Sequence, residues 1–215
     1  MGDLTLIIAN KTYSSWSLRA WLALKATGAP FKEVLVPLGQ PETRRAILQH
    51  TQSGRVPALK TGDLTIWDSL AVGEYLSEAF PDAGLWPGGR DARAVARSVV
   101  AEMHSGFADL RRHLPMDLKH DRSGKAQTPE VDADIGRILE LWRTCRARFG
   151  AGGPFLFGGF SLADAFYAPV VTRFATYGVE LDPVCTAYSE AVLDLPSMRE
   201  WKRDALAEPW VLGDH

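Results

Sequence analysis

The sequence predicts an α/β unit with a mixed four-stranded sheet, followed by a unit made only of helices. In the first eighty residues, short apolar runs alternate with helical patterns in the order strand, helix, strand, helix, strand, strand, helix. A stretch rich in glycine and proline, residues 81–90, then interrupts the pattern. Beyond it, apolar residues recur at every third or fourth position, as in helices that bury one face. We therefore expect domains at 1–80 and 91–215, with 81–90 as their linker.

The sheet is expected to combine a parallel pair of strands with a hairpin. Two apolar runs flank a helical pattern that ends at Gly28, which is the order of a parallel pair joined by a crossover helix. Two later runs face each other across a Gly62-Asp63 turn and predict a hairpin. The expected elements are strands at 4–9 and 31–36, a helix at 16–27 between them, a short helix after Pro41, strands at 58–61 and 64–67, and a helix from Asp68 to Phe80.

The second unit is expected to contain at least five helices. Its first apolar face runs without interruption from Val95 to Leu114, which predicts one long helix. The polar stretch that follows predicts a mobile loop. Ser161 and Asp164 have the spacing of a capping box and open a later helix. The expected elements are a helix over 95–114, the loop over 115–129, and helices over 131–149, from Ser161, around 185–193 and over 197–207.

Composition excludes several functional classes. The formal net charge is −2 and no long basic run occurs, so we expect no nucleic-acid partner. No apolar stretch approaches the roughly 18 residues that span a bilayer, so we expect no membrane partner. The first ten residues lack the basic start of a signal peptide, and Cys145 and Cys185 are too few for a disulfide framework. We expect a cytoplasmic protein with two buried, unpaired cysteines and no metal site.

The loop before the first helix carries hydroxyls where chemistry is favourable. It reads Tyr13-Ser14-Ser15-Trp16-Ser17 and lies between a strand and a helix. A helix N-terminus offers unpaired N–H groups and the positive end of the dipole, which favour an anion such as a thiolate. Serines also cap helices very often, so a purely structural role for Ser14 or Ser15 is the alternative interpretation.

Two further segments could meet a ligand. Pro57 begins a strand in Arg55-Val56-Pro57, and a cis Val56-Pro57 bond would turn the Val56 backbone outward, toward an extended peptide-like ligand. The alternative is an ordinary proline at the start of a strand. Asp68-Ser69 opens another helix, where a carboxylate would bind, and there the alternative is a simple N-cap.

Taken together, these three segments and the element order resemble the glutathione S-transferases over essentially the whole chain. Residues 14–19, Ser-Ser-Trp-Ser-Leu-Arg, are similar to the Ser-Ser-Cys-x-x-Arg signature of the zeta class. The resemblance implies a thioredoxin-like first domain, a helical substrate-binding second domain and a homodimer. It implies Ser14 as the catalytic serine, whereas a theta-class alignment selects Ser15. The stretches 102–107 and 114–116 look like uncharacterised bacterial members of the family.

The resemblance also implies how glutathione, the co-substrate, would be held. Val56 and the cis Pro57 would meet its cysteinyl part, and Asp68-Ser69 its γ-glutamyl end. Its glycine carboxylate needs a basic or amide partner, for which Arg55 is the nearest candidate and Gln40 a looser one. Trp16 occupies the cysteine position of the zeta signature, also beside glutathione.

The departures from the family pattern narrow the expected chemistry. Trp16 in place of the zeta cysteine argues against the maleylacetoacetate isomerase activity of that class. No cysteine lies in the loop, so thiol-transferase and disulfide chemistry are not expected.

The resemblance implies that the serine hydroxyl donates a hydrogen bond to the sulfur of glutathione, which then attacks a small electrophile. Arg97, His104 and Arg111 fall seven residues apart on the predicted first helix of the second domain, where they could receive an anionic substrate. The alternative is a solvated polar face. At the level of function, the alternatives are a non-catalytic glutathione- or ligand-binding protein on the same fold, and a glutathione-dependent isomerase or dehalogenase.

Overall fold

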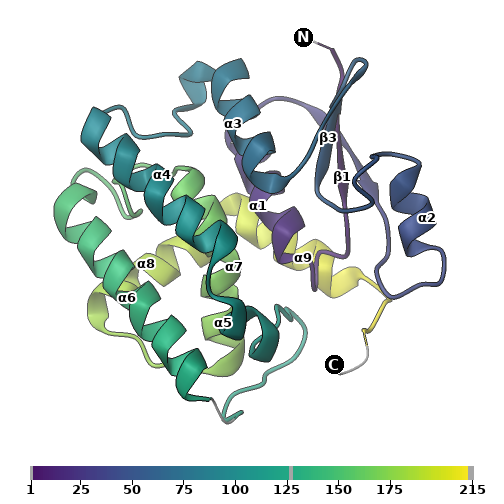
Figure 1. The fold of residues 1–215 in the computed structure, drawn as a ribbon. Helices are drawn as coiled ribbons and strands as arrows, with labels where there is room; N and C mark the ends of the chain where they lie inside the picture. Colours follow the sequence, from purple (N-terminus) through teal and green to yellow (C-terminus); the bar gives the residue numbers. More distant parts are fainter. Residues whose placement is uncertain (1, 126–127, 213–215) are drawn as a thin grey trace.

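A four-stranded sheet lies beside a bundle of helices in the computed structural model, which describes residues 2–125 and 128–212 (Figure 1). The sheet order is β2-β1-β3-β4. The strands β1 (Leu4–Ile8) and β2 (Phe31–Leu35) are parallel, and β3 (Ala58–Thr61) runs antiparallel to β1 and to β4 (Leu64–Ile66). The predicted mixed sheet, with its crossover and its hairpin, is confirmed.

Alternating side chains of β1 face two different sets of helices. Leu6 and Ile8 join the main core, into which α1 (Ser15–Ala26) and α3 (Ser69–Ala79) also pack. Ile7 points to the opposite face and packs in a small second cluster with Ile47 of α2 (Thr43–Leu48). This period-two alternation gives a sheet with helices on both faces.

The helical part is built around α7 (Leu162–Tyr177), which is buried along almost its whole length. It contacts α1, α4 (Arg90–Ser105) and α8 (Pro183–Leu193), and Figure 1 shows it in the middle of the bundle. The predicted capping box of Ser161 and Asp164 is present at its start. The remaining elements are the short 3-10 helix η1 (Pro81–Ala83) and the helices α5 (Ala108–His113), α6 (Pro129–Phe149) and α9 (Pro196–Ala207).

The predicted long helix over 95–114 is wrong, because the chain breaks at Gly106 and Phe107. Helix α4 ends at Ser105, Phe107 adopts a left-handed backbone conformation with φ of 55°, and α5 begins one residue later. A side chain at position 106 would place its Cβ 2.7 Å from the Glu102 carbonyl oxygen, so this turn requires glycine. Met103 before the break, Phe107 within it and Leu110 after it are all buried, and the apolar period therefore continues through the break.

The polar segment after α5, expected to be mobile, is held by a buried carboxylate. Asp117 is 3% exposed and accepts hydrogen bonds from the Lys119 and His120 amides and from Arg122 Nε, the last at 3.0 Å. Its backbone carbonyl accepts a bond of 2.8 Å from Thr176 Oγ1 of α7. The polar composition of this segment thus reflects an internal network. Its residues 126 and 127 lie outside the described part of the chain.

Segments from the two sides of residues 81–90 pack on each other. Helix α1 contacts both α7 and α9. The division into domains at 1–80 and 91–215 stays a prediction. Both cysteines are buried and free, as expected. Within residues 2–125 and 128–212, no helix combines the length and the apolar character needed to cross a bilayer.

Candidate functional site

Ser14 both caps α1 and lines a hollow. Its Oγ accepts the Ser17 amide at 3.3 Å and donates to Ser17 Oγ at 2.8 Å. Ser14 is 6% exposed and Ser15 is 5% exposed. Ser14 also lines a hollow on the surface, so it can cap the helix and still reach a ligand in that hollow.

Two adjoining hollows share Trp16, Arg55 and Val56 and thereby join most of the predicted glutathione residues. The first, about 580 Å³, also contains Ser14 and Gln40. The second, about 630 Å³, is lined by Trp16, Ser53, Arg55, Val56, Pro57, Trp67, Asp68, Ser69 and His104. Of the predicted glutathione residues and serines, only Ser15 is not among the residues that line these two hollows.

The Val56-Pro57 peptide bond is cis, as the resemblance implied, and so is the bond between Trp67 and Asp68. Asp68 caps α3, because its Oδ1 accepts the Leu70 and Ala71 amides at 2.9 and 3.4 Å. Ser69 is fully buried, and its Oγ has no hydrogen-bond partner within the described residues. A buried hydroxyl without a partner is costly, so a ligand that reaches it from the hollow gains a hydrogen bond.

His104 reaches the site from α4. Its Nε2 lies 3.1 Å from Asp68 Oδ2, and its ring meets the Trp16 ring edge-on at 5.3 Å between centroids. Its Nδ1 is buried and has no partner within the described residues.

The three cationic side chains expected on one helix do not stack, because α4 and α5 are separate. Arg111 lies on α5, where its guanidinium carbon is 5.7 Å from the Trp16 ring centroid and its Nη1 donates to the Met103 carbonyl at 3.2 Å. Burial lowers the pKa of Arg111. Arg97 points elsewhere: its Nε lies 3.5 Å from Glu74 Oε1, and its guanidinium covers Trp86 at 5.3 Å. The structure therefore brings His104 and Arg111 to Trp16, and leaves Arg97 outside the site.

Sequence reasoning assigned no role to Arg19, which lies fully buried beneath Trp16. Its guanidinium carbon is 4.3 Å from the Trp16 ring centroid and 5.1 Å from that of Phe166. Its three side-chain nitrogens have no hydrogen-bond partner within the described residues. Burial, reinforced by the charges of Arg173 and Arg111, lowers the pKa of Arg19 to about 9. The sequence signals for this residue were its place inside a helical apolar pattern and its position as the arginine of the signature at residues 14–19.

The charge balance of the site favours anions. The positive end of α1 and the guanidinium groups of Arg19 and Arg111 lie close to Trp16. The negative charge of Asp68 partly compensates the positive charge of Arg19. In the part of the chain that the structure describes, no group of three or more His, Cys, Asp and Glu side chains could hold a metal. A thiolate or a carboxylate fits this environment.

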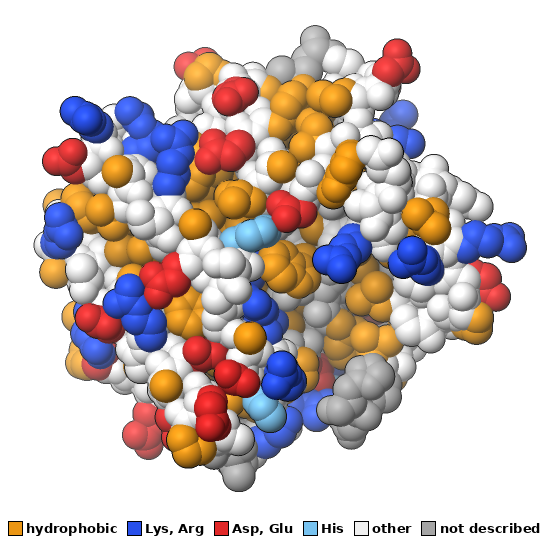
Figure 2. Space-filling view, viewed as in Figure 1, with side chains coloured by type: hydrophobic (Ala, Val, Ile, Leu, Met, Phe, Trp, Pro, Cys, Tyr) orange, Lys and Arg blue, Asp and Glu red, His pale blue; other side chains and the backbone are white. Residues whose placement is uncertain are grey.

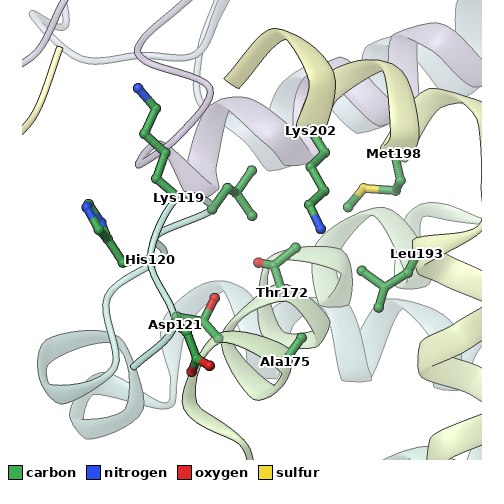
Figure 3. Close-up of a pocket in the computed structure, with 10 residues that line it drawn as sticks. Lys119, His120, Asp121, Thr172, Ala175, Leu193, Met198 and Lys202 are labelled. Atoms are coloured by element: carbon green, nitrogen blue, oxygen red, sulfur yellow. The ribbon is translucent and has the colours of Figure 1, made fainter. Parts of the chain in front are cut away.

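A separate hollow of about 400 Å³ lies between the 118–121 segment, α7 and α9. Figure 3 shows the Lys202 amine pointing into it toward Thr172, whereas Lys119 points away. None of its lining residues belongs to the two adjoining hollows that share Trp16, Arg55 and Val56. Elsewhere on the surface, basic and acidic side chains are interspersed on the face drawn in Figure 2, so this face presents no large field of one sign.

Comparison with protein families gives two matches that together span more than half of the chain. Residues 13–79 match the glutathione S-transferase N-terminal domain, and residues 126–214 match the C-terminal domain of the same family. This chain belongs to the glutathione S-transferase family. As a member, it is an enzyme of the glutathione-transferase type, with glutathione as co-substrate.

Similar glutathione S-transferases include plant and bacterial proteins. The chain is 26% identical to glutathione S-transferase Z2 of Arabidopsis thaliana, over 88% of each protein. It is also 26% identical to a maleylpyruvate isomerase of Ralstonia sp, over 80% of this chain and 86% of that protein.

Solved structures show the same fold. A glutathione transferase homologue from Burkholderia with bound glutathione superposes with a TM-score of 0.70 at 24% identity, covering 94% of this chain and 99% of that one. A zeta-class maleyl pyruvate isomerase superposes with a TM-score of 0.71 at 24% identity, covering 95% and 98%.

Proposed function

We propose that this glutathione S-transferase is of the serine type and that the Ser14 hydroxyl donates a hydrogen bond to the sulfur of glutathione. The observation that carries the proposal is the position of Ser14, at the N-terminus of α1 and on the border of a hollow that also contains Gln40, Arg55 and Val56 and adjoins the hollow of Asp68 and Ser69. No cysteine lies in this loop, so the thiol that reacts is that of glutathione.

The energy required is within reach of this arrangement. A free thiol titrates near pH 8.5, so only a few per cent of glutathione is thiolate at neutral pH. Lowering the thiol pKa by about two units takes roughly 2.7 kcal/mol. A charge-assisted hydrogen bond from Ser14, together with the positive end of α1, supplies a stabilisation of this size. Ser14 therefore acts as a hydrogen-bond donor, and the sulfur is the nucleophile.

The two hollows suggest one direction for glutathione. Ser69 Oγ, buried and without a partner in the described residues, and the Asp68 carboxylate would hold the γ-glutamyl end. The Val56 backbone would pair with the cysteinyl part, which places the sulfur toward Ser14. Arg55, exposed and bordering both hollows, would meet the glycine carboxylate, with Gln40 nearby.

We propose an electrophile that carries a carboxylate or another anionic group. His104 and Arg111 both approach Trp16 from the helical part of the molecule, and His104 also borders the hollow that contains Asp68 and Ser69. Both side chains are only partly buried, so an incoming anion can reach them. The sulfur would attack an electron-poor carbon of this substrate and form a new carbon–sulfur bond.

Alanine variants of the two serines test the proposal. Ser14→Ala is expected to lower kcat/KM for conjugation of chlorodinitrobenzene by about 100-fold or more, as removal of a donor to a developing anion does. Circular dichroism checks that the fold survives the loss of the cap, which costs about 1 kcal/mol. Ser15→Ala is expected to retain activity. If only Ser15→Ala loses conjugation activity, Ser15 and not Ser14 donates the hydrogen bond to the sulfur. Full activity in both variants would contradict the hydroxyl mechanism.

A glutathione-dependent isomerase is the second candidate. Relatives of comparable similarity are named maleylacetoacetate isomerase, for example in Rattus norvegicus at 28% identity over 80% of this chain and 78% of that protein. Trp16 at the position of the zeta cysteine argues against this activity. Rates of maleyl diacid isomerisation, conjugation and dehalogenation, each measured with glutathione, show which of these reactions the protein catalyses. Glutathione binding without any of the three reactions would indicate a non-catalytic binding protein.

We also propose that the protein is a homodimer. The proposal rests on the resemblance to the family. Leu64 of the edge strand β4 is 51% exposed and is available to a partner subunit. Sedimentation would measure the oligomeric state. A cytoplasmic location stays a prediction from the sequence.

A further inference from the structure

Ser17 occupies a buried position directly behind Ser14. It lies in the first turn of α1 and is 0% exposed. Its Oγ is 2.8 Å from Ser14 Oγ and accepts the amide of Ala9, the residue after β1, at 3.0 Å. The Ser17 hydroxyl therefore links the end of the first strand to the serine at the head of the first helix.

The hydrogen-bonding capacity of the two hydroxyls is limited. A serine hydroxyl donates one hydrogen bond and accepts two. Both acceptor positions of Ser17 Oγ are filled, by the Ala9 amide and by the Ser14 hydroxyl. Ser14 Oγ accepts only the Ser17 amide within the described residues, so it can accept one more hydrogen bond.

The proposed function requires the Ser14 proton to point away from Ser17. When Ser14 donates to the sulfur of glutathione, its proton leaves the 2.8 Å contact between the two oxygens. Two oxygens this close repel each other unless a proton lies between them. The Ser17 hydroxyl proton can take that place, because Ser14 Oγ has an acceptor position left.

We propose that Ser17 is a positioning residue that acts through Ser14, and that the hydrogen bond between the two hydroxyls reverses when glutathione becomes a thiolate. This inference rests on the proposed function. The resulting chain runs from the Ala9 amide to Ser17, from Ser17 to Ser14 and from Ser14 to the sulfur. Each hydroxyl keeps its own proton and only changes the direction in which it points. The one bond that breaks is the S–H bond of glutathione, whose electron pair stays on the sulfur while the proton leaves to water. Each donor in such a chain is polarised by the one behind it, which strengthens the bond to the anion.

The pKa of the glutathione thiol in the complex is the direct readout. It is followed by the ultraviolet absorbance of the thiolate as pH is varied with saturating glutathione. Ser17→Ala is expected to raise this pKa by about one unit, from about 6.5 to about 7.5, which leaves about threefold less thiolate at pH 7. The loss of kcat/KM should be greatest at neutral pH and should disappear at high pH, where glutathione ionises without help. The dissociation constant of glutathione should stay unchanged when measured well below the thiol pKa.

Three further variants make the result specific. Ser17→Thr keeps the hydroxyl and should keep the thiol pKa of the wild type. Ser17→Cys keeps a small side chain with a weaker donor and should give an intermediate pKa, which provides a second test if Ser17→Ala does not fold. Ser98→Ala removes an exposed serine of α4 whose hydroxyl donates to the Ala94 carbonyl, and controls for the loss of a helical hydroxyl.

Failure of this inference differs from failure of the proposed function. If Ser14→Ala abolishes the thiolate signal but folded Ser17→Ala and Ser17→Cys titrate like the wild type, the role of Ser17 is wrong and the role of Ser14 stands. An activity loss of equal size at every pH, with an unchanged thiol pKa, would assign Ser17 a merely structural role. If wild-type protein shows no thiolate at neutral pH, the proposed function itself is contradicted.

Discussion

Ser14 and Asp68 each satisfy the start of a helix while bordering the hollow proposed for glutathione. Ser14 Oγ accepts the Ser17 amide, and Asp68 Oδ1 accepts the Leu70 amide. Capping and ligand binding need the same atoms in the same place, since both use a polar side chain at the positive end of a helix. This overlap explains why the sequence could locate these residues without separating their two roles.

At the scale of single residues, the charge of Arg111 makes a testable difference to substrate choice. Arg111→Gln is expected to lower kcat/KM for conjugation of a chloronitrobenzoate by about tenfold or more, because a hydrogen bond to an anion is lost. Activity toward the uncharged methyl ester should change much less. The ratio of the two kcat/KM values, measured by absorbance, checks the prediction.

Arg112 provides the matched control for this substitution. It is the next residue of α5, and its side chain is 72% exposed with Asp109 at 3.8 Å. Arg112→Gln should leave the ratio of the two substrates as it is in the wild type. Equal loss toward acid and ester in Arg111→Gln would contradict an anionic subsite at this position.

The residues that sequence reasoning missed depend on partners distant along the chain. Ser17 gains its place in the site from the Ala9 amide, eight positions away, and Arg19 from Phe166 of α7. Local signals such as an N-cap or a proline at the start of a strand are readable without tertiary structure. A buried hydroxyl or guanidinium is defined by what surrounds it.

At the scale of elements, helix starts were easier to predict than the break between α4 and α5. The box of Ser161 and Asp164 is a local pattern with a known geometry, and it was found in place. The break at Gly106 does not disturb the apolar period, because Phe107 and Leu110 stay buried. That break moves Arg111 off the axis of α4, which is why Arg97, His104 and Arg111 do not form a row.

The capping box of α7 should also respond to pH. Asp164 is fully buried and accepts hydrogen bonds from the Leu156 and Ser161 amides, and burial raises its pKa to about 6. In the unfolded chain the carboxyl titrates near pH 3.9, so the folded state binds more protons between about pH 4 and 6. The contribution of Asp164 to stability therefore falls as pH rises through this window and is constant above it.

Removing the charge should remove this dependence. From pH 4 to pH 7, the free energy of unfolding of the wild type should fall relative to that of Asp164→Asn by up to about 3 kcal/mol. Urea denaturation at several pH values measures the difference, and Asp132→Asn, an exposed acid in the first turn of α6, controls for the change of charge. A difference between Asp164→Asn and wild type that is independent of pH would contradict the raised pKa.

At the scale of the whole molecule, the end of the chain holds the loop that precedes Ser14. Glu208, just after α9, accepts the amides of Lys11 and Thr12 at 2.6 and 3.1 Å and the Thr12 hydroxyl at 2.8 Å. Trp201 of α9 donates from Nε1 to the Lys11 carbonyl at 2.8 Å. Helix α9 packs beside α1 in Figure 1, so these contacts fix the position of the first loop from outside the sheet.

Loss of the Glu208 carboxylate should therefore loosen this loop. Glu208→Ala leaves two buried amides without acceptors, and we expect a loss of stability of about 1–3 kcal/mol or more. Amide hydrogen exchange at residues 11 and 12 should become faster, and kcat should fall.

A surface ion pair on the same helix gives the comparison. Glu200 of α9 pairs with Lys25 of α1 at 2.7 Å, with both side chains 34% exposed. Glu200→Ala should cost less than about 1 kcal/mol and leave exchange at residues 11 and 12 unchanged. Equal effects of the two variants would contradict a special role for Glu208.

The organisation of the molecule was predictable because the period of apolar residues changes from the first eighty residues to the rest. The packing of α9 against the first loop was not, because Lys11 and Glu208 are 197 positions apart and neither lies in a local motif. The hydrogen-bond network after α5 was not predictable for a related reason. A single buried carboxylate, Asp117, organises that segment, and polar composition alone does not distinguish a buried acid from an exposed one.

The most direct test of the central claim is the ultraviolet difference spectrum of glutathione bound to the protein at neutral pH, compared between wild type and Ser14→Ala. Calorimetric titration recorded alongside shows whether glutathione is bound. We expect a thiolate band in the wild type and its loss in Ser14→Ala, with glutathione still bound in both. Bound glutathione without a thiolate band in the wild type, or an undiminished band in Ser14→Ala, would contradict activation by the Ser14 hydroxyl.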